Sequence, residues 1–157
     1  MTTITPYLWF DNNAEEAIEF YSGIFPDAKT TDEARWPEGG PVPAGTLMNA
    51  SFELAGQKFI VLNGGPAFTF TEAISFLVSV ETQEEVDKYW NALTADGGEE
   101  SQCAWLKDKF GLSWQIVPTA LIRYLTDPDP VKAGRVGQAM MQMQKIIIAD
   151  LDAAYAG

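Results

Sequence analysis

The pattern of apolar and polar positions divides the chain into two similar runs, each with a strand, a helix and further strands. In the first run, β-branched and aromatic residues at 4–10 predict a strand. We expect Asn13 to cap the following helix with Glu16 as its reciprocal partner, and Pro26 to end it. The helix has one apolar face, formed by Ala17, Phe20, Tyr21, Ile24 and Phe25.

The same pattern returns about 70 residues later, which indicates a tandem repeat. Residues 74–80 predict a strand, and Thr82 with Glu85 forms a capping box before the next helix. The apolar face of that helix consists of Val86, Tyr89, Trp90 and Leu93. Each half of the chain therefore begins in the same way.

Each half also ends in strands joined by a glycine turn, at Gly56 and at Gly111. Aligning the two turns matches Ile60 with Gln115. We expect module 1 at about 1–66 and module 2 at about 72–120. Since a half of ~60 residues buries too little apolar surface to be stable alone, the modules should share one core in a single domain, 1–157.

Two segments lie outside this repeat. Residues 26–45 predict a strand around 30–35 and then a loop rich in Pro and Gly, either a lid over a pocket or a plain connector. A C-terminal helical extension at about 127–157 should begin at Pro130 with Asp129 as its cap. Its stripe of Val136, Met140 and Met143 is either core or a contact with a partner chain.

Composition narrows the class of protein. The chain is 46% hydrophobic and 20% charged, which is typical of a globular protein, and its formal charge of −12 disfavours nucleic acid as a partner. The one cysteine, Cys103, can form no intrachain disulfide, and we expect it to be a small buried hydrophobe. With no signal-peptide pattern and no membrane-spanning run, we expect a cytoplasmic protein with no membrane partner.

Several longer motifs carry a resemblance to a known family. The stretches "PYLWFDNNAEEAIEFYSGIFPDAK", "SFELAGQKF", "GGEESQCAWLKDKFGLSWQIVP" and "DPDPVKAGRVGQAMMQMQKI" resemble the PhnB-like branch of the glyoxalase, bleomycin-resistance and extradiol dioxygenase (vicinal oxygen chelate) superfamily. Many members of that branch are described as 3-demethylubiquinone-9 3-methyltransferases. The resemblance implies an α+β fold in which tandem βαβββ modules form a cup-shaped mixed β-sheet with flanking helices.

In metal-binding members of this superfamily, the first and last strands of each module supply ligands. The matching positions here are Thr5, Ser75, Ile60 and Gln115. Two hydroxyls, an isoleucine and an amide do not form a competent set, and the chain has no histidine. It also has no G-x-G-x-x-G turn to support methyl transfer from S-adenosylmethionine. We therefore expect no metal and no cofactor.

Strand alternation lines the cup with aromatic residues, a few hydroxyls and one amide, which suits a small organic molecule. Gln115 either faces this cavity or is hydrogen-bonded to neighbouring backbone, and Trp9 and Trp105 either stack on a ligand or pack in the core. The candidate ligand-binding residues are Thr5, Tyr7, Trp9, Ile60, Leu62, Asn63, Ser75, Gln102, Trp105 and Gln115.

Our leading hypothesis is a metal-free, homodimeric protein that binds a small organic molecule in the cup, and no catalytic residue is assigned. One alternative is an enzyme of lyase, isomerase or dioxygenase type, with or without a metal. Another is a protein with an interaction role only, in which its own side chains fill the cup.

Overall fold

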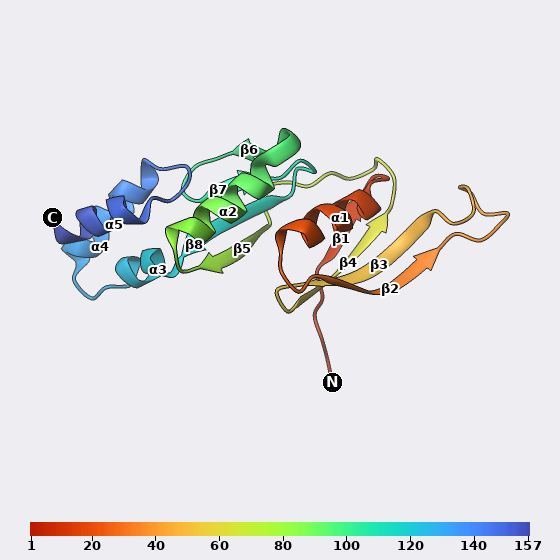
Figure 1. Cartoon of the computed structure of the whole chain (residues 1–157), viewed down its shortest axis with the longest axis horizontal. Helices are drawn as coiled ribbons and strands as arrows, with labels where there is room; N and C mark the ends of the chain where they lie inside the picture. Colours follow the sequence, from red (N-terminus) through yellow and green to blue (C-terminus); the bar gives the residue numbers. More distant parts are fainter. The chain divides into compact units, whose positions relative to one another are not determined.

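The computed structural model describes all residues, 1–157, which divide into two compact units, Met1–Phe70 and Thr71–Gly157 (Figure 1). Both contain a four-stranded mixed sheet with a helix on one face, so the expected tandem βαβββ fold is confirmed. None of the helices combines the length and apolar character that crossing a membrane requires.

The first unit has one helix and four strands. They are β1 (Tyr7–Phe10), α1 (Ala14–Ile24), β2 (Lys29–Arg35), β3 (Leu47–Leu54) and β4 (Gln57–Asn63). The strand order is β1-β4-β3-β2, with β1 and β4 parallel and the other pairs antiparallel.

The predicted apolar face of α1 attaches this helix to its sheet. Ala14, Ala17 and Tyr21 are fully buried, and the Tyr21 ring stacks on Phe52 with 6.4 Å between the ring centroids. The helix ends at Ile24, because a residue that precedes a proline disfavours the helical conformation.

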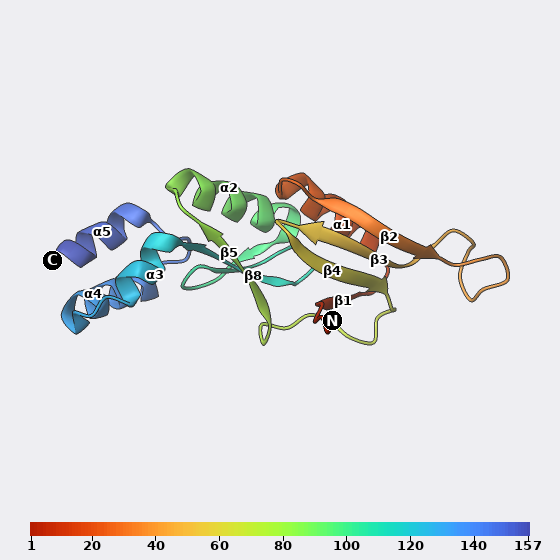
Figure 2. The ribbon, with the colours of Figure 1, turned by 90° about the horizontal axis from the view of Figure 1, so that it is seen from below.

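The second unit repeats this order and adds helices. Its elements are β5 (Ser75–Val80), α2 (Gln83–Thr94), the 3-10 turn η1 (Ala95–Gly97), β6 (Glu99–Glu100), β7 (Trp105–Lys107), β8 (Ser113–Pro118), α3 (Thr119–Leu125), α4 (Pro130–Met141) and α5 (Ile148–Ala156). The strand order is β5-β8-β7-β6, and α2 lies along one face of the sheet (Figure 2).

The repeat extends to the register of the parallel strand pairs. Tyr7 lies opposite Ile60 in the first unit, and Leu77 lies opposite Gln115 in the second. Leu77 follows Tyr7 by the predicted repeat of about 70 residues, and Ile60 and Gln115 are the predicted equivalents. The two sheets are therefore built on one plan.

Three local predictions were wrong. Strand β1 begins at Tyr7, because Pro6 has no N–H to donate to the ladder, and this leaves Ile4 95% exposed. Asn13 makes no side-chain capping bond to α1. Cys103 is half-buried with a φ of 57°, not a buried core residue. The capping box of Thr82 and Glu85, in contrast, is confirmed.

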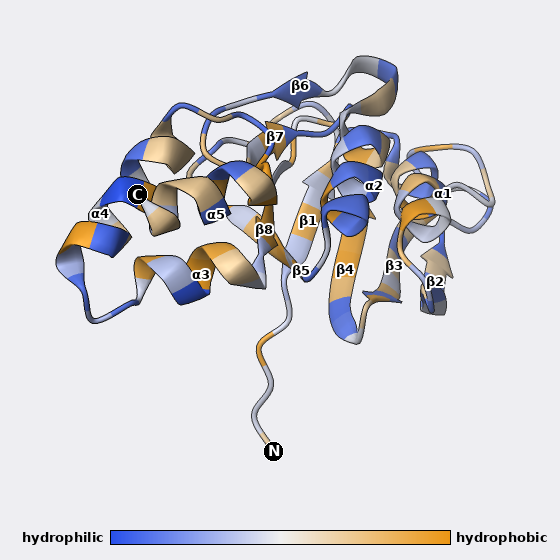
Figure 3. Ribbon diagram, turned by 60° about the vertical axis from the view of Figure 1, so that its left-hand side comes forward, coloured by the Kyte–Doolittle hydropathy of each residue, from blue (hydrophilic) through white to orange (hydrophobic).

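The β7–β8 turn is organised by a buried carboxylate. Asp108 is 2% exposed, and its Oδ1 accepts hydrogen bonds from the backbone N–H groups of Phe110 (2.9 Å) and Leu112 (3.0 Å). Its Oδ2 accepts a 2.9 Å bond from the indole N–H of Trp114. This side chain therefore connects the turn to the inner strand β8. Figure 3 shows β8 as mostly hydrophobic and the edge strand β6 as hydrophilic.

The C-terminal extension, predicted at about 127–157, packs as part of the second unit, and α3 precedes it. Asp129 caps α4 as predicted. Val136, Ile146 and Leu151 are fully buried in one cluster with Val117 of β8, and Met140 and Met143 pack against it, so the methionine stripe is core. The helix α3 was not predicted, because it follows Pro118 directly and has no side-chain cap.

Polar contacts also attach the extension to the start of α2. The Gln83 amide donates to Ile146 O (3.0 Å) and accepts from Ile148 N (2.8 Å). Lys145 forms a 2.7 Å ion pair with Asp87, and this ammonium holds the pKa of Asp87 below its ordinary value. The extension is thus joined to both the helix and the sheet of its unit.

We predict that Asp108→Ala lowers the free energy of unfolding by at least about 3 kcal/mol, because three donors lose their acceptor and two belong to buried residues. Urea unfolding followed by circular dichroism measures this, with the exposed Asp32→Ala as the matched control. A loss below about 1 kcal/mol would contradict the assigned role.

We predict that the Asp87 ion pair makes stability depend on acid pH. Because the folded-state pKa lies below the ordinary value of 3.8, the contribution is complete above that pH and is lost as pH falls through the folded pKa. Asp87→Asn should remove this pH-dependent part of the free energy of unfolding, which is at most about 1 kcal/mol for a partly exposed pair. Urea unfolding measured at several values from neutral to acid pH gives the free energy of unfolding as a function of pH. If this free energy had the same pH dependence in Asp87→Asn and in the wild type, the prediction would be wrong.

Candidate functional site

The open face of the second sheet presents the candidate residue Gln115. Trp114 and Ile116 are 3% and 0% exposed on the face that α2 covers, so alternation along β8 sets Gln115 on the opposite face. Its Nε2 donates a 2.9 Å hydrogen bond to the Ser75 hydroxyl of β5. The amide therefore pairs with another candidate side chain and not with backbone.

Apolar side chains flank this pair in the same row of the sheet. Leu77 and Trp105 lie on either side of Gln115 in the strand register, the first 53% exposed and the second half-buried. The next row contains Ser113, which is 1% exposed and whose hydroxyl has no hydrogen-bond partner. The open face thus combines apolar side chains with the Ser75 hydroxyl and the Gln115 amide, whereas the Ser113 hydroxyl is buried.

An ion pair lies beside these rows. Lys107, opposite Ser113 on β7, pairs with Glu72. The hydrogen bond from the ammonium lowers the pKa of Glu72, and the same bond raises the pKa of Lys107. Both groups stay charged near neutral pH and balance each other.

The open face of the first sheet is more apolar. Tyr7 is 54% exposed, and Ile60 and Leu62 are half-buried beside it. The Trp9 indole donates a 2.9 Å bond to Gly65 O, and its ring meets Phe68 edge-on at 5.0 Å. A Cβ at Gly64 would lie 2.4 Å from this ring, so the turn after β4 needs glycine to hold Trp9.

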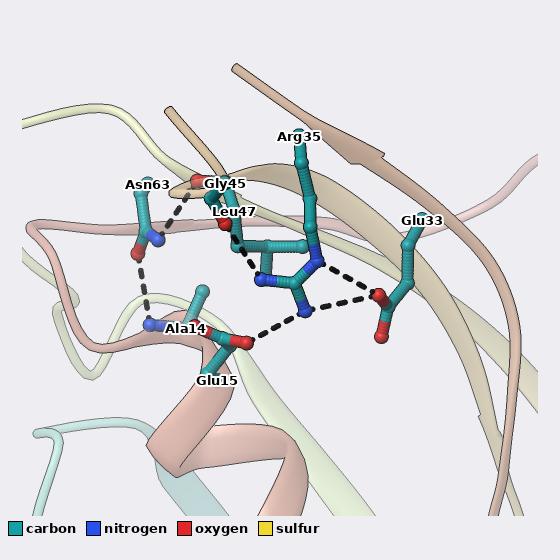
Figure 4. Close-up of polar contacts among 7 residues, drawn as sticks. All are labelled: Ala14, Glu15, Glu33, Arg35, Gly45, Leu47 and Asn63. Carbon is teal, nitrogen blue, oxygen red and sulfur yellow. Dashed lines mark hydrogen bonds and ion pairs between the residues drawn. The ribbon is translucent and has the colours of Figure 1, made fainter. Parts of the chain in front are cut away.

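The candidate residue Asn63 has a structural role. Its Oδ1 accepts a 2.9 Å bond from Ala14 N and thereby caps α1, and its Nδ2 donates to Leu47 O at 3.1 Å (Figure 4). This bond satisfies the first N–H of the helix, whereas the capping bond that the sequence predicted from Asn13 is not formed. Both ends of the amide are therefore engaged in the fold.

The ten candidate residues fall into two groups. Six lie in the first unit (Thr5, Tyr7, Trp9, Ile60, Leu62 and Asn63) and four in the second (Ser75, Gln102, Trp105 and Gln115). The structure brings Ser75, Trp105 and Gln115 together. Thr5 precedes β1, and Gln102 is exposed in the connection between β6 and β7.

The first unit has a cavity of about 390 Å³, for which the sequence indicated only the loop and none of the other lining residues except Asn63. Asp11 and Asn12 line it together with Trp36, Val42 and Thr46 of the β2–β3 connection, and of the candidates only Asn63 reaches it. The loop rich in Pro and Gly within residues 26–45 forms one side of this cavity, and it was the one feature of the sequence that suggested a pocket here.

The mapped positions do not fit a transition metal. The Ser75 oxygen is engaged by the Gln115 amide, Ile60 has no donor atom, and Thr5 lies outside the strand. No group of three or more histidine, cysteine, aspartate or glutamate side chains is placed to hold an ion.

The model of the protein family described as 3-demethylubiquinone-9 3-methyltransferase matches residues 2–117. The C-terminal extension lies beyond this range. No curated protein matches the chain.

Solved structures share the fold. The PhnB protein of Bacillus cereus is 36% identical, with a TM-score of 0.67, and the alignment covers 74% of this chain and 99% of that protein. Protein PA1353 from Pseudomonas aeruginosa is 23% identical, with a TM-score of 0.56 and coverage of 74% and 96%. The fosfomycin resistance protein FosX of Listeria monocytogenes, solved with Mn(II) and sulfate, is 16% identical, with a TM-score of 0.52 and coverage of 74% and 89%.

We predict that Asn63→Ala lowers the free energy of unfolding by about 1–3 kcal/mol, since it removes the cap of α1 and leaves Leu47 O without its partner. The exposed Asn12→Ala is the control, with an expected change within about 0.5 kcal/mol. Equal urea midpoints for the two variants would disprove the structural role of Asn63.

Proposed function

The chain belongs to the 3-demethylubiquinone-9 3-methyltransferase family, and we propose that it binds a small organic molecule without a metal ion. The site is the open face of the second sheet, with Ser75, Trp105 and Gln115 as its centre. Tyr7, Ile60 and Leu62 form the corresponding surface of the first sheet.

The observation that carries this proposal is the Gln115–Ser75 hydrogen bond on a half-open surface. The bond fixes the amide through its Nε2, so that its Oε1 can accept a bond from a ligand. The Ser75 hydroxyl keeps its own hydrogen to donate. A ligand with a neighbouring donor and acceptor matches this pair, while Leu77 and Trp105 supply apolar contact area.

The donor atoms support a metal-free site. A hydroxyl and an amide that bond to each other are poor ligands for a transition metal, which prefers imidazole, thiolate or carboxylate. The methyltransferase description has no support in the residues either, because the chain lacks a glycine-rich G-x-G-x-x-G turn. We therefore infer binding and assign no reaction. The single domain over 1–157, the homodimer and the cytoplasmic location stay predictions.

Native mass spectrometry and elemental analysis of protein purified without chelator test the proposal. We expect a bound organic mass and no stoichiometric transition metal. Stoichiometric nickel, zinc, iron or manganese would instead support the metal-dependent lyase, isomerase or dioxygenase alternative. A chain that retains no small molecule would favour the interaction role.

We predict that Gln115→Leu weakens binding of the co-purified molecule by about three- to tenfold, the effect of losing one hydrogen bond. The control is Gln138→Leu, an exposed glutamine of α4. Isothermal titration with the released and re-added molecule measures both. Unchanged affinity in Gln115→Leu would remove this residue from the site.

A further inference from the structure

We propose that the cavity of the first unit is a second binding site, which takes a small organic cation with an apolar body. It is built from three segments: the β1–α1 turn with Asp11 and Asn12, the β2–β3 connection with Trp36 and Val42, and the turn after β4. Its lining contains neither of the paired residues Ser75 and Gln115, so it does not depend on the function proposed above.

Hydrogen bonds within the unit hold these segments in place. Arg35 Nη1 donates to Gly45 O at 3.0 Å, and Nη2 pairs with Glu15 of α1 at 2.7 Å, which joins the β2–β3 connection to the helix (Figure 4). Asn63 joins the end of β4 to Ala14 and Leu47. The cavity is therefore formed before a ligand enters, and less binding energy is lost in ordering it.

Trp36 supplies an aromatic wall. The connection closes on itself through bonds from Trp36 N to Thr46 O (2.9 Å) and from Gly45 N to Trp36 O (2.8 Å). A Cβ at Gly40 would lie 3.2 Å from the Trp36 ring, so the loop packs closely on one part of the indole. Val42, 39% exposed, adds an aliphatic surface. An indole face attracts cations through its quadrupole.

The charges around the cavity favour a cation. No lysine or arginine lines it, and Asp11 and Asn12 of its lining are exposed. The nearby Arg35 is already paired with Glu15 and Glu33, at 2.7 and 3.0 Å. An anion would meet Asp11 and a chain of net charge −12, whereas an ammonium group gains an ion pair.

The volume limits the size of the ligand. A cavity of about 390 Å³ is near the lower end of the range for small-molecule pockets, about 300–1,000 Å³. It suits one ring with a short chain. The expected class is therefore an aryl-alkyl amine in its protonated form.

Three probes of similar size separate charge from shape: phenethylammonium, neutral 2-phenylethanol and the anion phenylacetate. Titration followed by ¹⁵N–¹H NMR should show phenethylammonium shifting the Trp36 indole N–H and the Asn12 side-chain amide, with a millimolar Kd that rises with salt. 2-Phenylethanol should bind more weakly, and phenylacetate should cause no shift. No shift with phenethylammonium, or equal binding of the neutral probe, would overturn the proposal.

Substitutions in the cavity test where phenethylammonium binds. Asp11→Asn should weaken phenethylammonium binding about two- to fivefold, as expected for an exposed ion pair, and Trp36→Leu should weaken it about two- to fivefold as well. Asp150→Asn, with the same change of charge on α5, should leave the Kd unchanged. A native-like NMR spectrum establishes that each variant is folded. If Asp11→Asn and Asp150→Asn had the same effect, the ion would be bound only by the overall charge, which would refute the site.

Discussion

The hydrogen bond from Trp114 to Asp108 sets which side chains of β8 face α2. With the indole held under the helix, Ile116 must lie on the same face and Gln115 on the other. A shift of the strand by one residue would place the amide under α2, without the Ser75 partner that it has on the open face, and bring two large apolar side chains to the open face. The energetic cost of that alternative makes the position of Gln115 a consequence of the core and not of any ligand.

The two units show how one framework can carry different surfaces. Both have the same strand order, and both pair their first strand in parallel with their last. At equivalent positions the first unit has Ile60 and the second has Gln115, so the second open face presents an amide where the first presents an aliphatic side chain. The C-terminal extension adds a further difference, since it lies beyond the matched family range and buries Val117 at the end of β8.

The features that the sequence predicted are those set by nearby residues. The capping box at Thr82, the cap at Asp129, the helix faces and the repeat all depend on residues a few positions apart or on a simple period, and the structure confirms them. Asn13 makes no side-chain capping bond, and the N–H of Ala14 is bonded instead by Asn63, which lies 49 positions further on. Such a partner is visible only once the strands are placed. The cavity of the first unit combines three distant segments, and the carboxylate of Asp108 has three donors around it, so neither follows from spacing alone.

The central claim is that the open face of β8 presents an amide–hydroxyl pair in place of metal ligands. A crystal structure of the protein, purified from cells without chelator, tests it most directly. Our account predicts that Gln115 Nε2 donates to Ser75 or to a bound organic molecule, with Trp114 buried on the opposite face. A metal ion coordinated by side chains at Thr5, Ser75 or Gln115, or a β8 strand with Gln115 beneath α2, would contradict it.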